Sequence, residues 1–69
     1  MLQKLKLAGY RKMLNLNQEQ MAIKLGISRQ AYSEKERGKV PFKESEMRLI
    51  KSLVKEVNEK VTIDEIFFN

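Results

Sequence analysis

Two helix starts and two helix stops fall within one short stretch of this chain, and they constrain its fold more than any other feature. Asn17 is a residue type that caps helix N-termini, and Gly26 is the type that ends helices in the left-handed conformation. Ser28 is a second N-cap, and Gly38 stops the helix that follows it. The sequence therefore predicts two short helices joined by a turn of about three or four residues.

A connection this short cannot lay two helices antiparallel, so they must cross steeply, as in a helix-turn-helix. In the first of them the apolar side is formed by Met21, Ala22 and Leu25. Ala22 favours such a crossing because its small side chain lets the second helix approach closely. Ile27, in the turn, adds an apolar anchor.

The second helix, residues 28–37, has a polar face made of Arg29, Gln30, Ser33, Glu34 and Arg37. Arginine pairs with guanine O6 and N7 together, and glutamine pairs with adenine N6 and N7. This face is typical of a helix that reads DNA bases. An ordinary solvated face is the alternative, and the helix by itself leaves both open.

Length and composition exclude several classes of function. The 69 residues suffice for one small domain spanning 1–69. Cysteine and histidine are absent, which excludes a Cys/His zinc site and removes the commonest general acid–base residue. We therefore expect no enzyme, no metal and no cofactor. The lack of cysteine suits a reducing cytoplasm, and neither a membrane-length apolar run nor a signal-peptide h-region is present.

The positive charge is concentrated in the half that holds the two short helices. The chain carries a net charge of +5. Residues 1–40 have nine Lys/Arg against three Glu, or +6, whereas residues 41–69 have five against six acidic residues, or −1. This asymmetry favours a polyanionic partner for the first half, although a generally basic domain is a common alternative.

Three further helices are expected around this pair. Apolar spacing predicts one from Leu2 to Leu14, closed by a left-handed Asn15. Another should run from about Lys43 or Glu44 to Val57, with an inward face formed by Met47, Ile50, Val54 and Val57. A last helix over 63–67 should be capped by Thr62. The fold class is therefore all-α.

Four segments together resemble the lambda-type repressor and Cro helix-turn-helix family of phage, plasmid and bacterial regulators, also described as XRE-like. They are L-N-Q-E-Q-M-A, L-G-I-S-R-Q-A-Y-S, E-R-G-K-V-P and I-D-E-I-F, and the resemblance spans about residues 5–67. Their order and spacing are specific. The resemblance implies a five-helix lambda repressor-like domain whose third helix enters the major groove of DNA.

The resemblance also implies roles for individual residues. Base contacts are expected from Arg29, Gln30, Ser33 and Glu34. Contacts to the DNA backbone are expected from Asn17, Gln18, Arg37 and Lys39. Gln18 should also brace the recognition helix, and Arg11 and Glu36 should form a largely buried salt bridge between the first and third helices. The sequence supports that pair, because Arg11 adjoins apolar positions and Glu36 lies off the polar face.

Three features depart from the family pattern. Lys35 lies where the family usually has an apolar residue, and we expect its stem along apolar surface with its ammonium in water. Tyr32 replaces a smaller branched residue, so its ring must be accommodated near Ala22. Glu34 and Glu44 put negative charge close to the expected DNA, where Glu34 either accepts from cytosine N4 or repels phosphate.

The combined interpretation is a sequence-specific, double-stranded-DNA-binding transcriptional regulator, expected to be a repressor. It should bind a palindromic operator as a homodimer, at least on DNA, with no membrane involved. Phe67 and Phe68 are candidates for the dimer contact, although Phe67 closing the core is an equal alternative. The main rival is an antitoxin-type regulator that binds a protein partner with the same fold. An RNA binder is disfavoured because a helix cannot read the deep groove of A-form RNA.

Overall fold

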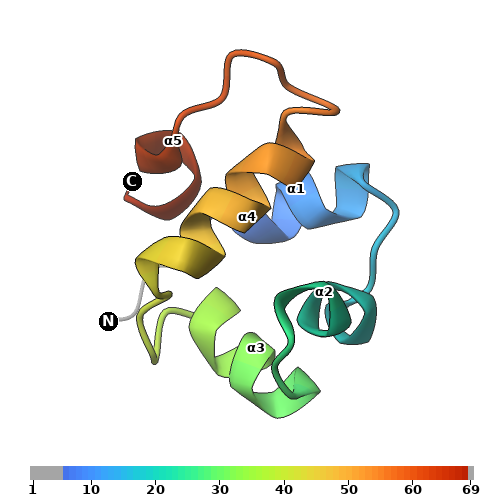
Figure 1. The fold of residues 1–69 in the computed structure, drawn as a ribbon, viewed down its shortest axis with the longest axis vertical. Coiled ribbons are helices and arrows are strands. Elements are labelled where there is room, and N and C mark those ends of the chain that lie inside the picture. The colour runs from blue at the N-terminus through green and yellow to red at the C-terminus, as the bar shows by residue number, and fades with distance from the viewer. Residues whose placement is uncertain (1–5, 69) are drawn as a thin grey trace.

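The described residues of the computed structural model, 6–68, form five α-helices and no strand (Figure 1). The helices are α1 (Leu7–Met13), α2 (Gln18–Leu25), α3 (Arg29–Glu36), α4 (Glu44–Val54) and α5 (Ile63–Phe67). This confirms the all-α, five-helix fold class. α2 and α3 pack against each other at the lower end of the view, and α4 packs against α5.

The ends of α2 and α3 are set by the residues expected to set them. Asn17 Oδ1 accepts from the Gln20 backbone N–H over 2.7 Å, and Gln20 Oε1 accepts from the Asn17 N–H over 2.9 Å. Ser28 Oγ accepts from the Ala31 N–H over 3.0 Å. Gly26 has φ 72°, the left-handed value that ends α2. Side-chain caps of this kind typically stabilise a helix by about 1 kcal/mol each.

The C-terminus of α3 has a Schellman motif that fixes how the chain leaves the helix. Gly38 has φ 82° and donates its N–H to the Lys35 carbonyl over 3.0 Å. Lys39 donates its N–H to the Glu34 carbonyl over 2.9 Å. The sequence predicted that this helix would run to Arg37, but Arg37 is its C-cap.

Two helices end earlier than the sequence predicted. α1 (Leu7–Met13) has Lys6 as its N-cap and stops before Leu14, and the expected start at Leu2 lies outside the described residues. The expected extension of α4 to Val57 is wrong, because the helix ends at Val54. There the chain tightens to i→i−3 hydrogen bonds, as in the Val57 N–H donating to the Val54 carbonyl over 3.0 Å. Val57 consequently turns off the inward face and is 39% exposed.

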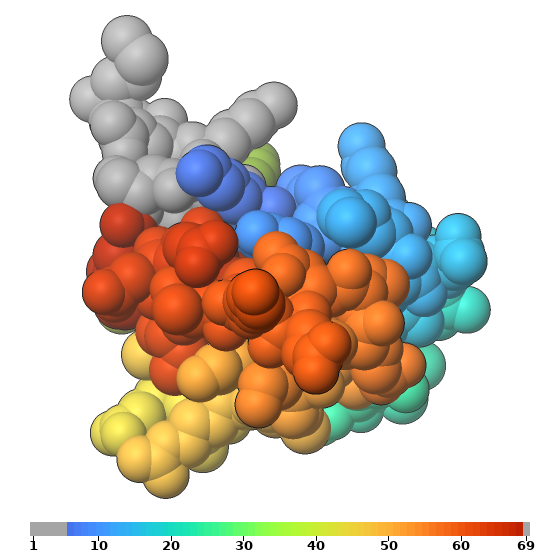
Figure 2. Space-filling view, turned by 90° about the horizontal axis from the view of Figure 1, so that it is seen from above, coloured from blue at the N-terminus to red at the C-terminus, as the bar shows by residue number. Residues whose placement is uncertain are grey.

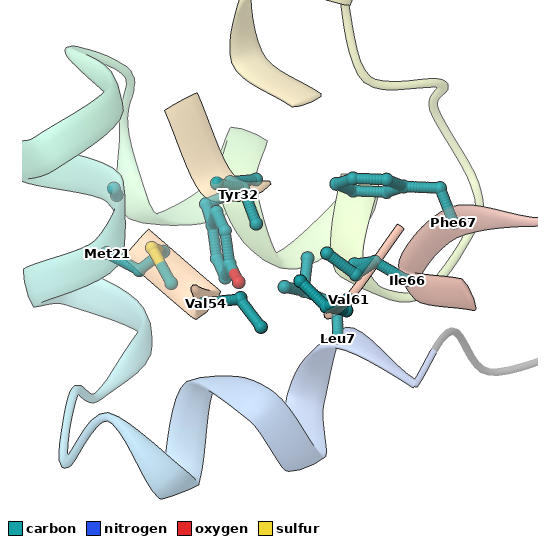
Figure 3. Packing of buried hydrophobic residues seen from close by; sticks show 9 residues of the cluster. Leu7, Met21, Tyr32, Val54, Val61, Ile66 and Phe67 are labelled. Atoms are coloured by element: carbon teal, nitrogen blue, oxygen red, sulfur yellow. The ribbon is translucent and has the colours of Figure 1, made fainter. Parts of the chain in front are cut away.

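The buried core draws on all five helices (Figure 3). Its members are Leu7, Met21, Ala22, Tyr32, Ile50, Val54, Val61, Ile66 and Phe67. The Tyr32 ring lies in the middle of this cluster, with its hydroxyl directed toward α1. Phe42, from the α3–α4 connection, packs edge-on against Phe67 at 5.1 Å between centroids. Phe42 also packs edge-on against Tyr32 at 6.1 Å between centroids, so the two aromatic contacts link α3 to α5.

The face turned away from α3 is formed by α1, α5 and the α4–α5 connection (Figures 1 and 2). In the space-filling view the orange connection lies between red α5 and blue α1. At the end of α5, Phe67 is buried, whereas the next residue, Phe68, is 62% exposed. Phe67 therefore closes the core, and only Phe68 is left as exposed aromatic surface at this end of the chain.

Candidate nucleic-acid interface

One face of α3 carries the side chains that the sequence singled out for base contacts. Arg29 and Gln30, in the first turn, are exposed. Ser33 and Glu34, one turn later, are half-buried against the rest of the domain. A helix that enters the major groove reaches base edges first with its N-terminal residues. The two side chains best suited to bidentate base contacts therefore occupy the most accessible end of the helix.

The side chains expected to contact the DNA backbone flank this face. Arg37 and Lys39 are exposed at the C-terminal end of α3. Asn17 is exposed and Gln18 half-buried at the N-terminus of α2, where backbone N–H groups favour anions. Because α2 packs on α3, these polar groups belong to the same helix pair as Arg29 and Gln30.

A buried hydrogen-bonded network holds α3 on the side opposite its exposed face. Arg11 Nε and Nη2 donate to the two oxygens of Glu36 over 2.8 and 3.2 Å. Arg11 Nη1 also donates to the Leu16 carbonyl over 2.9 Å. Tyr32 donates its hydroxyl to Glu36 over 2.6 Å, and Gln18 Nε2 donates over 3.1 Å. The Glu36 carboxylate thus ties α1, α2 and α3 together, and Gln18 links this network to the expected phosphate site.

A second buried ion pair corrects the expectation for Lys35. Its ammonium is not in water but donates to both oxygens of Glu46, over 2.7 and 2.8 Å. The side chains of Lys35 and Glu46 are only 10% and 8% exposed. Glu46 was not singled out from the sequence. Lys35 itself was the one indication of such a pair. It follows the buried Tyr32 by three residues, and a charge buried at this position requires an oppositely charged partner.

A family model described as helix-turn-helix matches residues 7–50, well over half of the chain. The chain belongs to the Cro/C1-type helix-turn-helix family. It is therefore a DNA-binding regulator of the Cro class. No curated protein and no solved structure matches the chain.

In this Cro-type chain, Glu44 lies apart from the two buried networks. It is exposed and pairs with Arg48 one turn along α4, over 2.6 Å. Exposed pairs of this spacing typically contribute only about 0.3–0.5 kcal/mol. Within residues 6–68, no group of three potential metal ligands occurs, and no helix combines the length and apolar character that crossing a membrane requires.

The two buried carboxylates of the Cro-type domain have lowered pKa values. Burial alone raises the pKa of Glu36, but hydrogen bonds from Arg11, Tyr32 and Gln18 together outweigh it. At Glu46, burial is likewise outweighed by the ammonium of Lys35 and by a backbone N–H. Burial and the hydrogen bond to Glu36 raise the pKa of Tyr32, so its hydroxyl remains a donor.

Acid is therefore expected to destabilise the fold through these two groups. Their carboxyls bind protons more readily in the unfolded chain, so the stability they provide is present above the ordinary value of 4.5 and is lost as the pH falls through their folded pKa values. Urea unfolding from about pH 6 to about pH 3 measures this. Lys35→Met combined with Glu46→Leu should make the decline shallower. Stability that rises on acidification contradicts the assignment.

Proposed function

We propose that this Cro-type regulator binds a specific double-stranded operator with α3 in the major groove and represses transcription. The observation that carries the proposal is the accessibility of Arg29 and Gln30 on a helix held rigidly from behind. In the proposed complex, Arg29 and Gln30 read base edges, with Ser33 and Glu34 beside them. The proposed repression acts by steric exclusion, in which a domain lying in the groove blocks other proteins from the same DNA.

Contacts to the sugar-phosphate backbone are proposed to position this reading helix. The groups concerned are Asn17, Gln18, Arg37 and Lys39. Contacts of this kind fix register and supply affinity that does not depend on sequence. Gln18 has a double role in this proposal. Its amide nitrogen holds Glu36, so a phosphate bound beside it is coupled to the network that orients α3.

We further propose that two copies bind a palindromic operator, with their reading helices about 34 Å apart. Phe68 and Val40 support this, because they are 62% and 38% exposed and border the same apolar groove of about 290 Å³. The groove is lined by Lys35, Gly38, Val40, Pro41, Phe42, Met47, Phe67 and Phe68. A two-fold interface requires a self-complementary patch, which an exposed ring beside an apolar groove provides. Selection of duplexes from a random pool should enrich a motif with two-fold symmetry.

Binding to duplex DNA should weaken steeply with salt. Each neutralised phosphate contributes roughly −0.9 to the slope of log K against log salt concentration. Four backbone-contacting side chains are proposed per copy, of which Arg37 and Lys39 are charged, so each copy should contribute a slope of about −2. Fluorescence anisotropy with the selected duplex, repeated across salt concentrations, measures the slope. If no duplex is bound even at low salt, the proposed function is wrong.

The same selected duplex distinguishes repression from the rival role of a protein-binding regulator. When the selected sequence is placed over a promoter that drives a reporter, the protein should lower expression of that reporter. A scrambled duplex serves as the control. Unchanged expression despite tight binding in vitro would favour the rival, in which a protein partner completes the function.

A further inference from the structure

The Lys35–Glu46 ion pair joins the two helices at either end of the α3–α4 connection. Lys35 lies in the last turn of α3 and Glu46 in the first turn of α4. Both carboxylate oxygens accept from the one ammonium, so the geometry across the connection is well defined. Between the two residues lie exposed Arg37 and Lys39, which are proposed to meet the DNA backbone.

Each end of this connection donates a backbone hydrogen bond to a residue of the ion pair. At the first end, Gly38 donates its N–H to the carbonyl of Lys35 itself. At the other end, the Lys43 N–H donates to Glu46 Oε1 over 2.8 Å, the same oxygen that holds the ammonium of Lys35 at 2.7 Å. One carboxylate therefore sets the distance between the end of α3 and the start of α4. The ammonium of Lys35 also lies 6.0 Å from the ring centroid of Phe42, a residue of this connection.

We propose that Lys35 and Glu46 are positioning residues for DNA binding, which hold the segment 37–43 so that Arg37 and Lys39 face the phosphate backbone. The inference rests on the proposed function. Neither residue touches DNA, because both are buried. Their effect is to hold the backbone of the segment 37–43 in place before binding, and ordering such a loop during binding weakens affinity.

The ion pair is a poor candidate for a purely stabilising element. Desolvation of two buried charges offsets most of their attraction, and an apolar pair of similar volume is often as stable or more so. An apolar pair packs equally well in many relative positions of α3 and α4, whereas the bidentate ion pair specifies a single relative position. Stability and positioning are therefore separable by substitution at these two sites.

The test is the double variant Lys35→Met Glu46→Leu, which keeps the net charge and replaces both charged side chains with apolar ones of similar size. Its matched control is Lys55→Met Glu56→Leu, which makes the same chemical changes at exposed residues following α4. Thermal denaturation establishes that each variant is folded at the assay temperature. We expect the buried double variant to bind the selected duplex about tenfold more weakly and to have a shallower salt slope, by about 0.9 for each phosphate that is no longer neutralised. The control should bind as the unmodified protein does.

Two results separate failure of the inference from failure of the proposed function. If the unmodified protein binds no duplex, the proposed function fails and the inference falls with it. If it binds, and the folded double variant binds equally tightly with an unchanged slope, only the inference is overturned. Should the double variant not fold, Glu46→Gln replaces it, with Glu56→Gln as control. Glu46→Gln must then lose affinity and salt slope relative to Glu56→Gln, and equal values overturn the inference.

Discussion

Glu36→Ala is expected to destabilise the fold by about 3–5 kcal/mol, because it leaves the Arg11 guanidinium buried without its carboxylate. Arg11 is about one-tenth exposed, so water does not replace the missing partner. The Tyr32 hydroxyl and the Gln18 amide lose the same acceptor. Small domains have total stabilities of about 5–15 kcal/mol, so this one change removes a large part of the margin.

Thermal and urea denaturation measure this effect. For a domain of this size, a loss of 3 kcal/mol lowers Tm by at least about 12 °C. Glu34→Ala is the matched control, because it makes the same substitution two residues earlier in α3, outside the network. Its stability should change by no more than about 0.5 kcal/mol. An unchanged Tm for Glu36→Ala, accompanied by loss of DNA binding, would mean that Glu36 acts in recognition.

The starts of α2, α3 and α5 and the ends of α2 and α3 could be predicted because each depends on chemistry within a few residues. Asn17, Ser28 and Thr62 have short polar side chains that reach a backbone N–H three positions along the chain. Gly26 and Gly38 adopt positive φ at little steric cost. The predicted end of α4 was wrong because apolar spacing was the only guide to it. That spacing continues to Val57, but it does not reveal that the last turn tightens.

The interior of the site was less predictable, because its contacts join residues far apart in the sequence. The pairing of Arg11 with Glu36 came from the family resemblance, and the sequence added only partial support, since 25 positions separate the two residues. Lys35 was assigned to the surface because a lone lysine usually keeps its ammonium in water. Only the fold brings Glu46 within 2.7 Å of it. Tyr32 is a similar case, because the sequence indicated only where its ring must fit, whereas its hydroxyl also donates to Glu36.

Arg29→Ala and Gln30→Ala are expected to relax the choice of DNA sequence. Both side chains are exposed in the first turn of α3, and each offers a bidentate match to one base. Each change should weaken binding to the selected operator by about 1–3 kcal/mol and flatten the preference at one base pair. The salt slope should change less for Gln30→Ala than for Arg29→Ala, because only Arg29 carries a charge.

Lys39→Ala provides the contrast, because Lys39 is exposed beyond the end of α3 and its proposed contact with phosphate is that of a point charge. It should weaken binding to operator and random DNA by similar factors and lower the salt slope by about one. Glu34→Ala decides between two interpretations of a half-buried carboxylate. If Glu34 accepts from cytosine N4, specificity falls, whereas if it repels phosphate, binding to all DNA tightens. The measurement is the affinity of each variant for the operator and its single-base derivatives. If Arg29→Ala and Gln30→Ala preserve the ranking of those derivatives, α3 does not read the sequence with its first turn.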